Sequence, residues 1–160
     1  GMWRCVWVLC ALAGARAQGT CAWGDGDGGC ADAEAPPASV EQLLAGMVST
    51  PSVNALYGTF DGPFAEAQLS EYLERTAVGF GLEATRLPLT DGSGAHNLLV
   101  TPPEHLISTS KRWLLFDSHI DTVAVEGMTV DPFGAEVRDG KMYGRGSCDT
   151  KASGAASLWA

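Results

Sequence analysis

The strongest constraint on the fold is a short apolar run at residues 112–116 that leads directly into polar side chains. Four of its five residues are large and apolar, a composition typical of strands that are buried inside a covered sheet. We therefore predict a central β-strand here. The polar residues that follow would lie at the carboxyl edge of the sheet, where open α/β proteins collect their ligands.

Two amphipathic helices are predicted before this strand. Ser39 is a suitable N-cap for the first helix, Gln42 follows three residues later as in a capping box, and Pro51 ends it. The second is predicted over residues 63–79, with apolar side chains at helical spacing. Both helices are expected to be scaffold.

Further short strands are predicted at residues 82–87 and 97–101. A hairpin is predicted at residues 135–143, because Asp139 and Gly140 suit the positive φ angles of a tight turn. The last residues, 150–160, are expected to begin a helix. Strands that follow helices indicate the α/β class, with helices packed on a mixed β-sheet.

The first 38 residues differ in composition from the rest of the chain. Residues 2–17 combine an early positive charge, an apolar run and a small-x-small site, as signal peptides do, which would make the protein secreted. Gly1 before Met2 also fits an expression remnant or an incomplete reading frame, and without a signal peptide the protein would be cytoplasmic. We expect residues 1–38 to be a signal-like and disordered leader, with one partial domain at residues 39–160.

Composition excludes several kinds of partner. The formal net charge of -9 argues against nucleic acid, which is usually met by clustered Lys and Arg. The apolar run near the N-terminus is shorter than the about 20 residues that span a bilayer, so no stable membrane anchor is expected. The five cysteines include no C-x-x-C pair, and residues 25–28 lack the full ligand set of a calcium loop.

The first block with candidate chemistry is residues 116–123. His119 and Asp121 lie two residues apart, so on an extended backbone their side chains point to the same side. A carboxylate in that place can orient an imidazole ligand. For this pair alone, a core histidine beside a turn aspartate remains the more common explanation.

The second block is residues 143–151, which follow a linking Asp-Pro-Phe at residues 131–133. The two blocks in this order resemble the co-catalytic zinc hydrolases: acetylornithine deacetylase, succinyl-diaminopimelate desuccinylase, glutamate carboxypeptidase and the aminoacylases. The resemblance covers residues 40–160, and residues 50–54 are a weaker match. It implies the N-terminal portion of a zinc-peptidase catalytic domain, without the lid and dimerisation domain.

The resemblance implies that His119 is a terminal ligand of one zinc and that Asp149 bridges two zinc ions. Asp121 becomes the catalytic acidic residue that supports the histidine ligand. Imidazole nitrogen and carboxylate oxygen are good zinc donors, and cobalt or manganese suits the same donors. Two zinc ions per site are expected in the complete enzyme, where they activate a water molecule.

Further expectations concern the loop formed by the second block. Gly144 and Gly146 would let the backbone pass close to the site, and the resemblance implies a cis peptide at Asp149–Thr150. Arg145 and Lys151 are expected to hold the loop, since the glycine spacing of a phosphate loop is absent.

Three further side chains are expected to have no role in the site. Cys148 is expected to pack, and His96 and His105 are expected at the surface.

The resemblance implies hydrolysis of a linear amide in a small N-acyl amino acid or peptide, by a homodimeric parent enzyme. The general base and the remaining ligands are expected beyond residue 160, so these 160 residues alone are expected to be inactive. A non-catalytic binding or regulatory homologue that keeps the fold without the metals is the alternative.

Overall fold

The computed structural model describes residues 5–11, 35–54, 65–90, 95–106 and 113–160, with backbone alone for residues 5–11. The elements follow in the order β1 (Cys5–Ala11), α1 (Val40–Ser49), α2 (Ala65–Gly79), β2 (Glu83–Pro88), β3 (His96–Thr101), η1 (Glu104–Leu106), β4 (Trp113–His119), β5 (Glu136–Arg138), β6 (Lys141–Tyr143) and α3 (Lys151–Trp159). Most of the predicted disordered leader lies outside the described residues.

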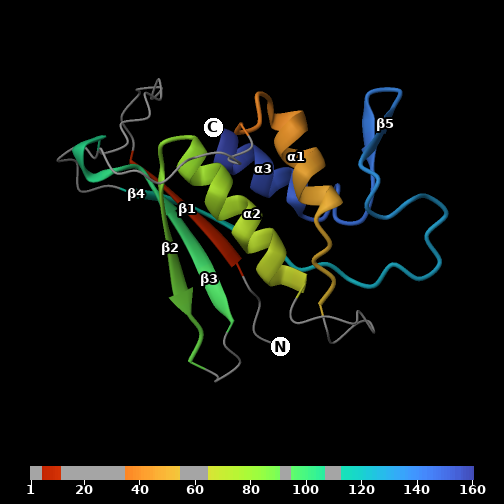
Figure 1. The fold of residues 1–160 in the computed structure, drawn as a ribbon, viewed down its shortest axis with the longest axis horizontal. Coiled ribbons are helices and arrows are strands. Elements are labelled where there is room, and N and C mark those ends of the chain that lie inside the picture. The colour runs from red at the N-terminus through yellow and green to blue at the C-terminus, as the bar shows by residue number, and fades with distance from the viewer. Residues whose placement is uncertain (1–4, 12–34, 55–64, 91–94, 107–112) are drawn as a thin grey trace, which may run out of the picture.

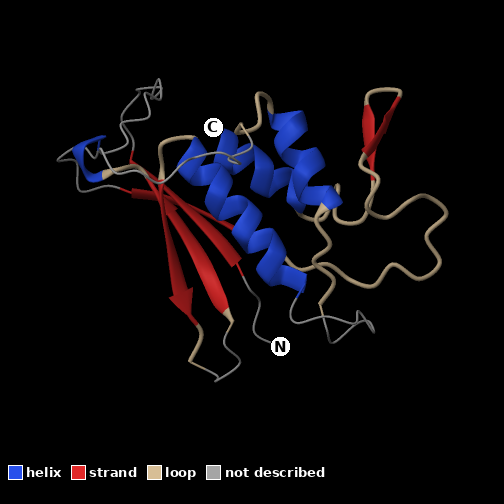
Figure 2. Cartoon of the chain, in the orientation of Figure 1, coloured by secondary structure: helices blue, strands red, loops and turns tan. Residues whose placement is uncertain are grey.

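Four strands form a mixed sheet in the order β2-β3-β1-β4. β1 runs parallel to β3 and antiparallel to β4, and β2 is antiparallel to β3. The predicted α/β class is confirmed, as Figures 1 and 2 show. The hairpin β5–β6 forms separately and turns at Asp139 and Gly140, whose φ angles of 51° and 71° are those expected for a tight turn.

The prediction that the apolar run at residues 112–116 forms a central strand is wrong. β4 lies at the edge of the four-stranded sheet, where β1 is its hydrogen-bonded neighbour among the described strands. Trp113, Leu114 and Leu115 are accordingly between 43% and 49% exposed. Apolar composition favours a strand, but it does not reveal how many neighbours that strand has.

The sheet also includes a segment that the sequence analysis assigned to the leader. The backbone of Cys5–Ala11 pairs with β4 along its whole length and with β3 over three residues. A short apolar run with β-branched valines suits a buried strand as well as the apolar part of a signal peptide, so the sequence pattern fits both. Export and the domain boundary at residue 38 stay predictions.

The helices form where their end signals lie. The Ser39 hydroxyl accepts a hydrogen bond from the Gln42 amide at 3.2 Å, and the Gln42 side chain accepts one from the Ala38 amide at 2.8 Å. α1 then ends at Ser49, before Pro51. These contacts satisfy amide groups that a helix start leaves without partners.

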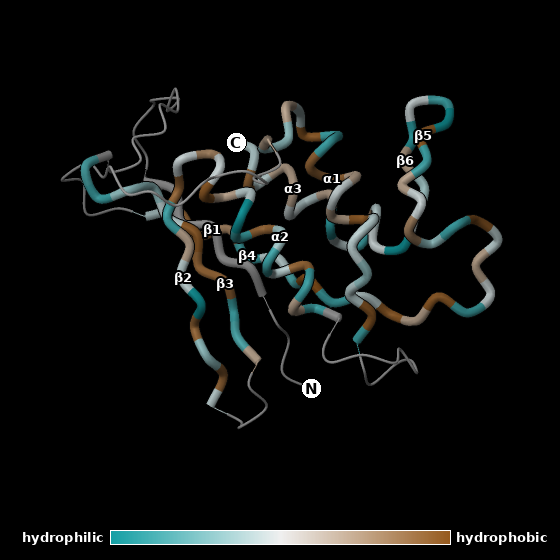
Figure 3. The backbone as a smooth tube through the Cα atoms, in the orientation of Figure 1, coloured by the Kyte–Doolittle hydropathy of each residue, from teal (hydrophilic) through white to brown (hydrophobic). Residues whose placement is uncertain are grey.

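Helices α2 and α3 pack against the sheet, and α1 packs on both of them (Figure 1). Leucine, methionine, valine and alanine side chains from all three helices and from β3 make the shared core: Leu43, Met47, Leu69, Leu73, Ala77, Leu98, Val100, Ala155 and Leu158. The tip of the β5–β6 hairpin is hydrophilic and stands apart (Figure 3). No helix in the described part of the chain is long and apolar enough to cross a membrane.

Candidate metal centre

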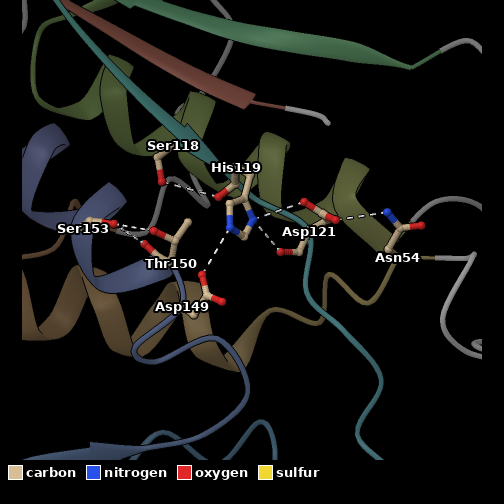
Figure 4. Close-up of polar contacts among 7 residues, drawn as sticks. All are labelled: Asn54, Ser118, His119, Asp121, Asp149, Thr150 and Ser153. Atoms are coloured by element: carbon tan, nitrogen blue, oxygen red, sulfur yellow. Dashed lines mark hydrogen bonds and ion pairs between the residues drawn. The ribbon is translucent and has the colours of Figure 1, made fainter. Parts of the chain in front are cut away.

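The two predicted metal ligands face each other although 30 residues separate them. His119 is the last residue of β4, and Asp149 lies two residues before α3 begins. The His119 Nε2 and the Asp149 Oδ1 are 3.3 Å apart (Figure 4). Packing of α3 against β4 in the core brings the strand end and the helix start together.

Asp121 contacts the other nitrogen of the same imidazole ring. Its Oδ1 lies 3.2 Å from the His119 Nδ1, and its backbone oxygen lies 3.1 Å from that nitrogen. The Asp121 side chain is nearly buried, at 9% exposed. The backbone acceptor at Nδ1 and the nearby carboxylate favour a proton there, which leaves the Nε2 lone pair directed towards Asp149.

Asn54 completes this arrangement and was missed by sequence reasoning. Its amide Nδ2 donates to the Asp121 Oδ2 at 3.0 Å (Figure 4). The segment after α1 lies beside the end of β4, since the Asn54 amide donates to the Thr122 carbonyl and the Thr122 amide donates to the Ser52 carbonyl, both at 2.8 Å. The weak match at residues 50–54 marked the segment, but not this contact.

The loop that carries Asp149 depends on two glycines, as predicted. Gly144 and Gly146 have φ angles of 155° and 80°, which disfavour other residues. A Cβ on Gly144 would collide with the Val48 side chain, and one on Gly146 would lie 2.9 Å from the Thr122 Cγ2. The predicted cis peptide at Asp149–Thr150 is also present.

The two blocks line one open cleft of about 310 Å³. Its lining is His119, Asp121, Thr122, Val123, Gly144, Arg145, Gly146, Ser147, Cys148 and Asp149. The Asp149 side chain is 90% exposed and precedes the positive end of the α3 dipole, which interacts favourably with a carboxylate. Cys148 is an exposed free thiol in this lining, so the prediction that it packs is wrong.

Lys151 and Arg145 differ in their surroundings. Lys151 is 1% exposed, and its ammonium donates to the carbonyls of Met47 and Thr50 at 2.8 and 3.0 Å. Burial lowers the pKa of Lys151 to about 8. The Arg145 backbone amide donates to the Pro132 carbonyl at 2.6 Å. Both residues therefore attach the loop to the rest of the fold, Lys151 through its side chain and Arg145 through its backbone.

The prediction that His96 lies at the surface needs correction. His96 is partly buried in β3, and its Nε2 lies 2.9 Å from the hydroxyl of the buried Ser70 on α2. His105 is exposed in η1, as expected. The His96 ring therefore joins helix α2 to the sheet, away from the cleft.

The facing donors fit a zinc ion in their separation. Two ligand atoms at about 2.0–2.1 Å from one tetrahedral zinc lie about 3.4 Å apart, close to the 3.3 Å between the His119 Nε2 and the Asp149 Oδ1. No cluster of three or more His, Cys, Asp or Glu able to hold a metal occurs among the described residues. The described part of the site therefore offers a two-donor arrangement.

Comparison with known proteins finds matches in the part of the chain that holds the cleft. The family model "Peptidase family M20/M25/M40" matches residues 115–160, which hold both blocks of the cleft. The succinyl-diaminopimelate desuccinylase of Wolinella succinogenes is 32% identical over 121 residues. These matches support membership of this chain in peptidase family M20/M25/M40. The two sequence blocks that resembled the family are thus the ones that form its cleft.

Other M20 relatives give the extent of the similarity. The Wolinella alignment covers 75% of this chain and 28% of the relative. Succinyl-diaminopimelate desuccinylase 2 of Ruegeria sp. is 54% identical over 44 residues, which are 26% of this chain and 11% of the relative. Acetylornithine deacetylase of Photorhabdus laumondii is 32% identical over 112 residues, 69% of this chain and 27% of the relative. No solved structure matches the chain.

The chain therefore spans just over a quarter of the length of the first of these relatives. The relatives are named as a desuccinylase and a deacetylase.

Proposed function

We propose that His119 and Asp149 bind zinc, in a protein that hydrolyses a linear amide bond. One observation carries the proposal: an imidazole nitrogen and a carboxylate oxygen lie 3.3 Å apart in an open cleft of an M20 family chain. Zinc prefers nitrogen and oxygen donors of these kinds. Bound zinc would supply Lewis-acid polarisation of the amide carbonyl.

The residues of this chain have distinct roles in the proposal. His119 presents its Nε2 because the Asp121 backbone oxygen accepts at Nδ1, and Asn54 donates to the Oδ2 of the Asp121 carboxylate, whose Oδ1 lies beside Nδ1. The two Asp121 oxygens face the imidazole and Asn54, whereas the Asp149 carboxylate is exposed, so Asp149 is the group here that could bridge two zinc ions. Its exposed position leaves one oxygen open to the cleft.

The substrate class follows from the relatives rather than from the cleft. Relatives named succinyl-diaminopimelate desuccinylase and acetylornithine deacetylase support a small N-acyl amino acid or peptide as substrate. We also propose that the full-length protein is a homodimer and binds two zinc ions in each site. With two facing donors in the described part of the site, the 160 residues alone should bind zinc weakly and leave amide substrates intact.

Zinc and cobalt binding by the chain tests the proposal. Calorimetry should detect weak zinc binding that is lost in His119→Ala and in Asp149→Ala, while His105→Ala, at an exposed histidine outside the cleft, should bind as the parent does. Cobalt should give a visible absorption spectrum that disappears in the same two variants. Tight binding that survives both substitutions would overturn the assignment of the ligands.

A further inference from the structure

Lys151 is buried more completely than any other charged side chain in the part of the chain that the structure describes. An unpaired buried ammonium is costly, so a lysine in such a position needs hydrogen-bond acceptors. Its acceptors are two backbone carbonyls, Met47 at 2.8 Å and Thr50 at 3.0 Å. The charge is therefore placed at the end of another helix and not in the cleft.

Those carbonyls belong to the last turn and C-cap of α1. The final carbonyls of a helix have no partner within it, and the helix dipole makes this end negative. α1 has no basic residue in its own last turn. Lys151, from the start of α3, supplies the cation and the donors that α1 lacks.

The stem of the same side chain contacts the loop that carries Asp149. A Cβ built on Gly146 would lie 3.1 and 3.2 Å from the Lys151 Cδ and Cε. The Lys151 backbone amide also donates to the Gly146 carbonyl at 3.0 Å. The loop is thus held between the Lys151 backbone and its side chain.

Both halves of the site meet at this residue. Thr50, which accepts from Lys151, begins the segment that leads to Asn54 and hence to Asp121 and His119. Asp149, two residues before Lys151, has a side chain that is 90% exposed. Its position therefore depends on the backbone on which Lys151 acts.

We propose that Lys151 is a positioning residue that ties the end of α1 to the loop and so sets Asp149 opposite His119. The consequence for zinc rests on the proposed function, whereas the ordering of the loop does not. Lys151 itself lies outside the cleft lining and acts through the backbone of residues 144–149 and 50–54.

Amide hydrogen exchange in the metal-free chain tests the positioning directly. In Lys151→Met, which keeps an apolar stem and removes the donors, the amides of Lys151 and Asn54 should exchange about tenfold faster than the change in global stability explains. Leu158→Ala, a core change in the same helix away from the loop, should lower global stability without this local effect. Equal changes in both variants would overturn the proposal.

A second variant keeps the test decisive if Lys151→Met does not fold. Lys151→Gln keeps a donor without the charge, so the same two amides should show a smaller increase in exchange. Unchanged exchange at both amides in a folded Gln variant would also contradict the role of the charge. Lys151→Arg, which keeps charge and donors, should restore protection.

Zinc binding separates this inference from the proposed function. Lys151→Met should weaken zinc binding about tenfold, because Asp149 would no longer be held opposite His119 and loss of support for a metal ligand has an effect of about this size. Leu158→Ala should leave zinc binding unchanged. If the parent chain bound no zinc through His119 and Asp149, the proposed function would fail while hydrogen exchange would still decide the positioning role.

Discussion

The two halves of the cleft are held in different ways. His119 ends a strand, and its orienting residue Asp121 is nearly buried between the imidazole and Asn54. Asp149 lies on a glycine loop with its side chain 90% exposed. The histidine half depends on the sheet and the segment beside it, whereas the aspartate half depends on helices α1 and α3.

In the proposed zinc site, this difference would combine a fixed ligand with an adjustable one. A ligand oriented by buried neighbours keeps its geometry without metal, because its contacts persist in the empty state. A ligand on an exposed loop is positioned by backbone anchors alone. We therefore expect substitutions at anchors such as Gly146 to affect the aspartate half most, and changes in the sheet to affect the histidine half most.

The largest effect is expected from deleting residues 2–17, which breaks the support of the histidine half. The deletion removes β1, so β3 and β4 lose the strand between them. The free energy of unfolding should fall on the order of 5 kcal/mol, since each backbone hydrogen bond contributes about 1 kcal/mol net. Urea denaturation measures this change.

Hydrogen exchange in the same deletion variant sharpens the comparison. Protection should be lost in β4 more than in α3, because α3 keeps its contacts with α1. An unfolding curve equal to that of the parent would show instead that residues 5–11 are a dispensable leader.

Gly146→Ala should disrupt the loop that positions Asp149. The substitution forces a side chain into a φ of 80° and against the Thr122 methyl group, which should cost about 2–3 kcal/mol and weaken zinc binding. Gly140→Ala is the matched control, because Gly140 has a φ of 71° with open space around it. The control should cost about 1 kcal/mol and leave zinc binding unchanged, by denaturation and calorimetry.

Asn54→Ala should weaken the histidine half with a smaller effect on stability. Loss of the hydrogen bond to the Asp121 carboxylate should cost about 1–2 kcal/mol and lower zinc affinity about tenfold. Asn54→Asp places a second carboxylate beside Asp121 and should be worse than Ala in thermal denaturation. Unchanged affinity in both variants would mean that Asp121 needs no support from this side.

Ser39→Ala should produce the smallest effect, at the far end of α1 from the cleft. Loss of the N-cap hydrogen bond should cost about 1 kcal/mol. Zinc binding by calorimetry should not change, and Ser39→Asp should retain parental stability. A loss of zinc affinity here would show that the whole of α1, and not its C-terminal end alone, positions the site.

Local signals predicted the helices and the hairpin well. The cap at Ser39, the stop before Pro51 and the turn at Asp139 and Gly140 form as expected, because they depend on contacts within a few residues. Position within the sheet was not predictable in this way. The apolar run that forms β4 lies at an edge, and a leader-like segment pairs beside it, since both facts depend on partners about 100 residues away.

The sequence was enough to predict most residues of the candidate site, but not the contacts between them. The residue types and spacing at His119, Asp121 and Asp149 were sufficient to name the candidates and the family resemblance. The contact of Asn54 with Asp121, the exposure of Cys148 and the burial of Lys151 under α1 could not be read from spacing. Each arises between segments that are distant in the chain.

The sequence by itself determined the local elements, the two glycines of the loop and the donor atoms available to a metal. The tertiary structure alone decided that His119 and Asp149 face each other at 3.3 Å and that Lys151 joins the two halves. The physical reason is the distance along the chain over which each kind of interaction acts. Caps, turns and φ preferences act within a few residues, whereas the separation of the His119 and Asp149 side chains is set by the packing of α1, α3 and β4 in one core.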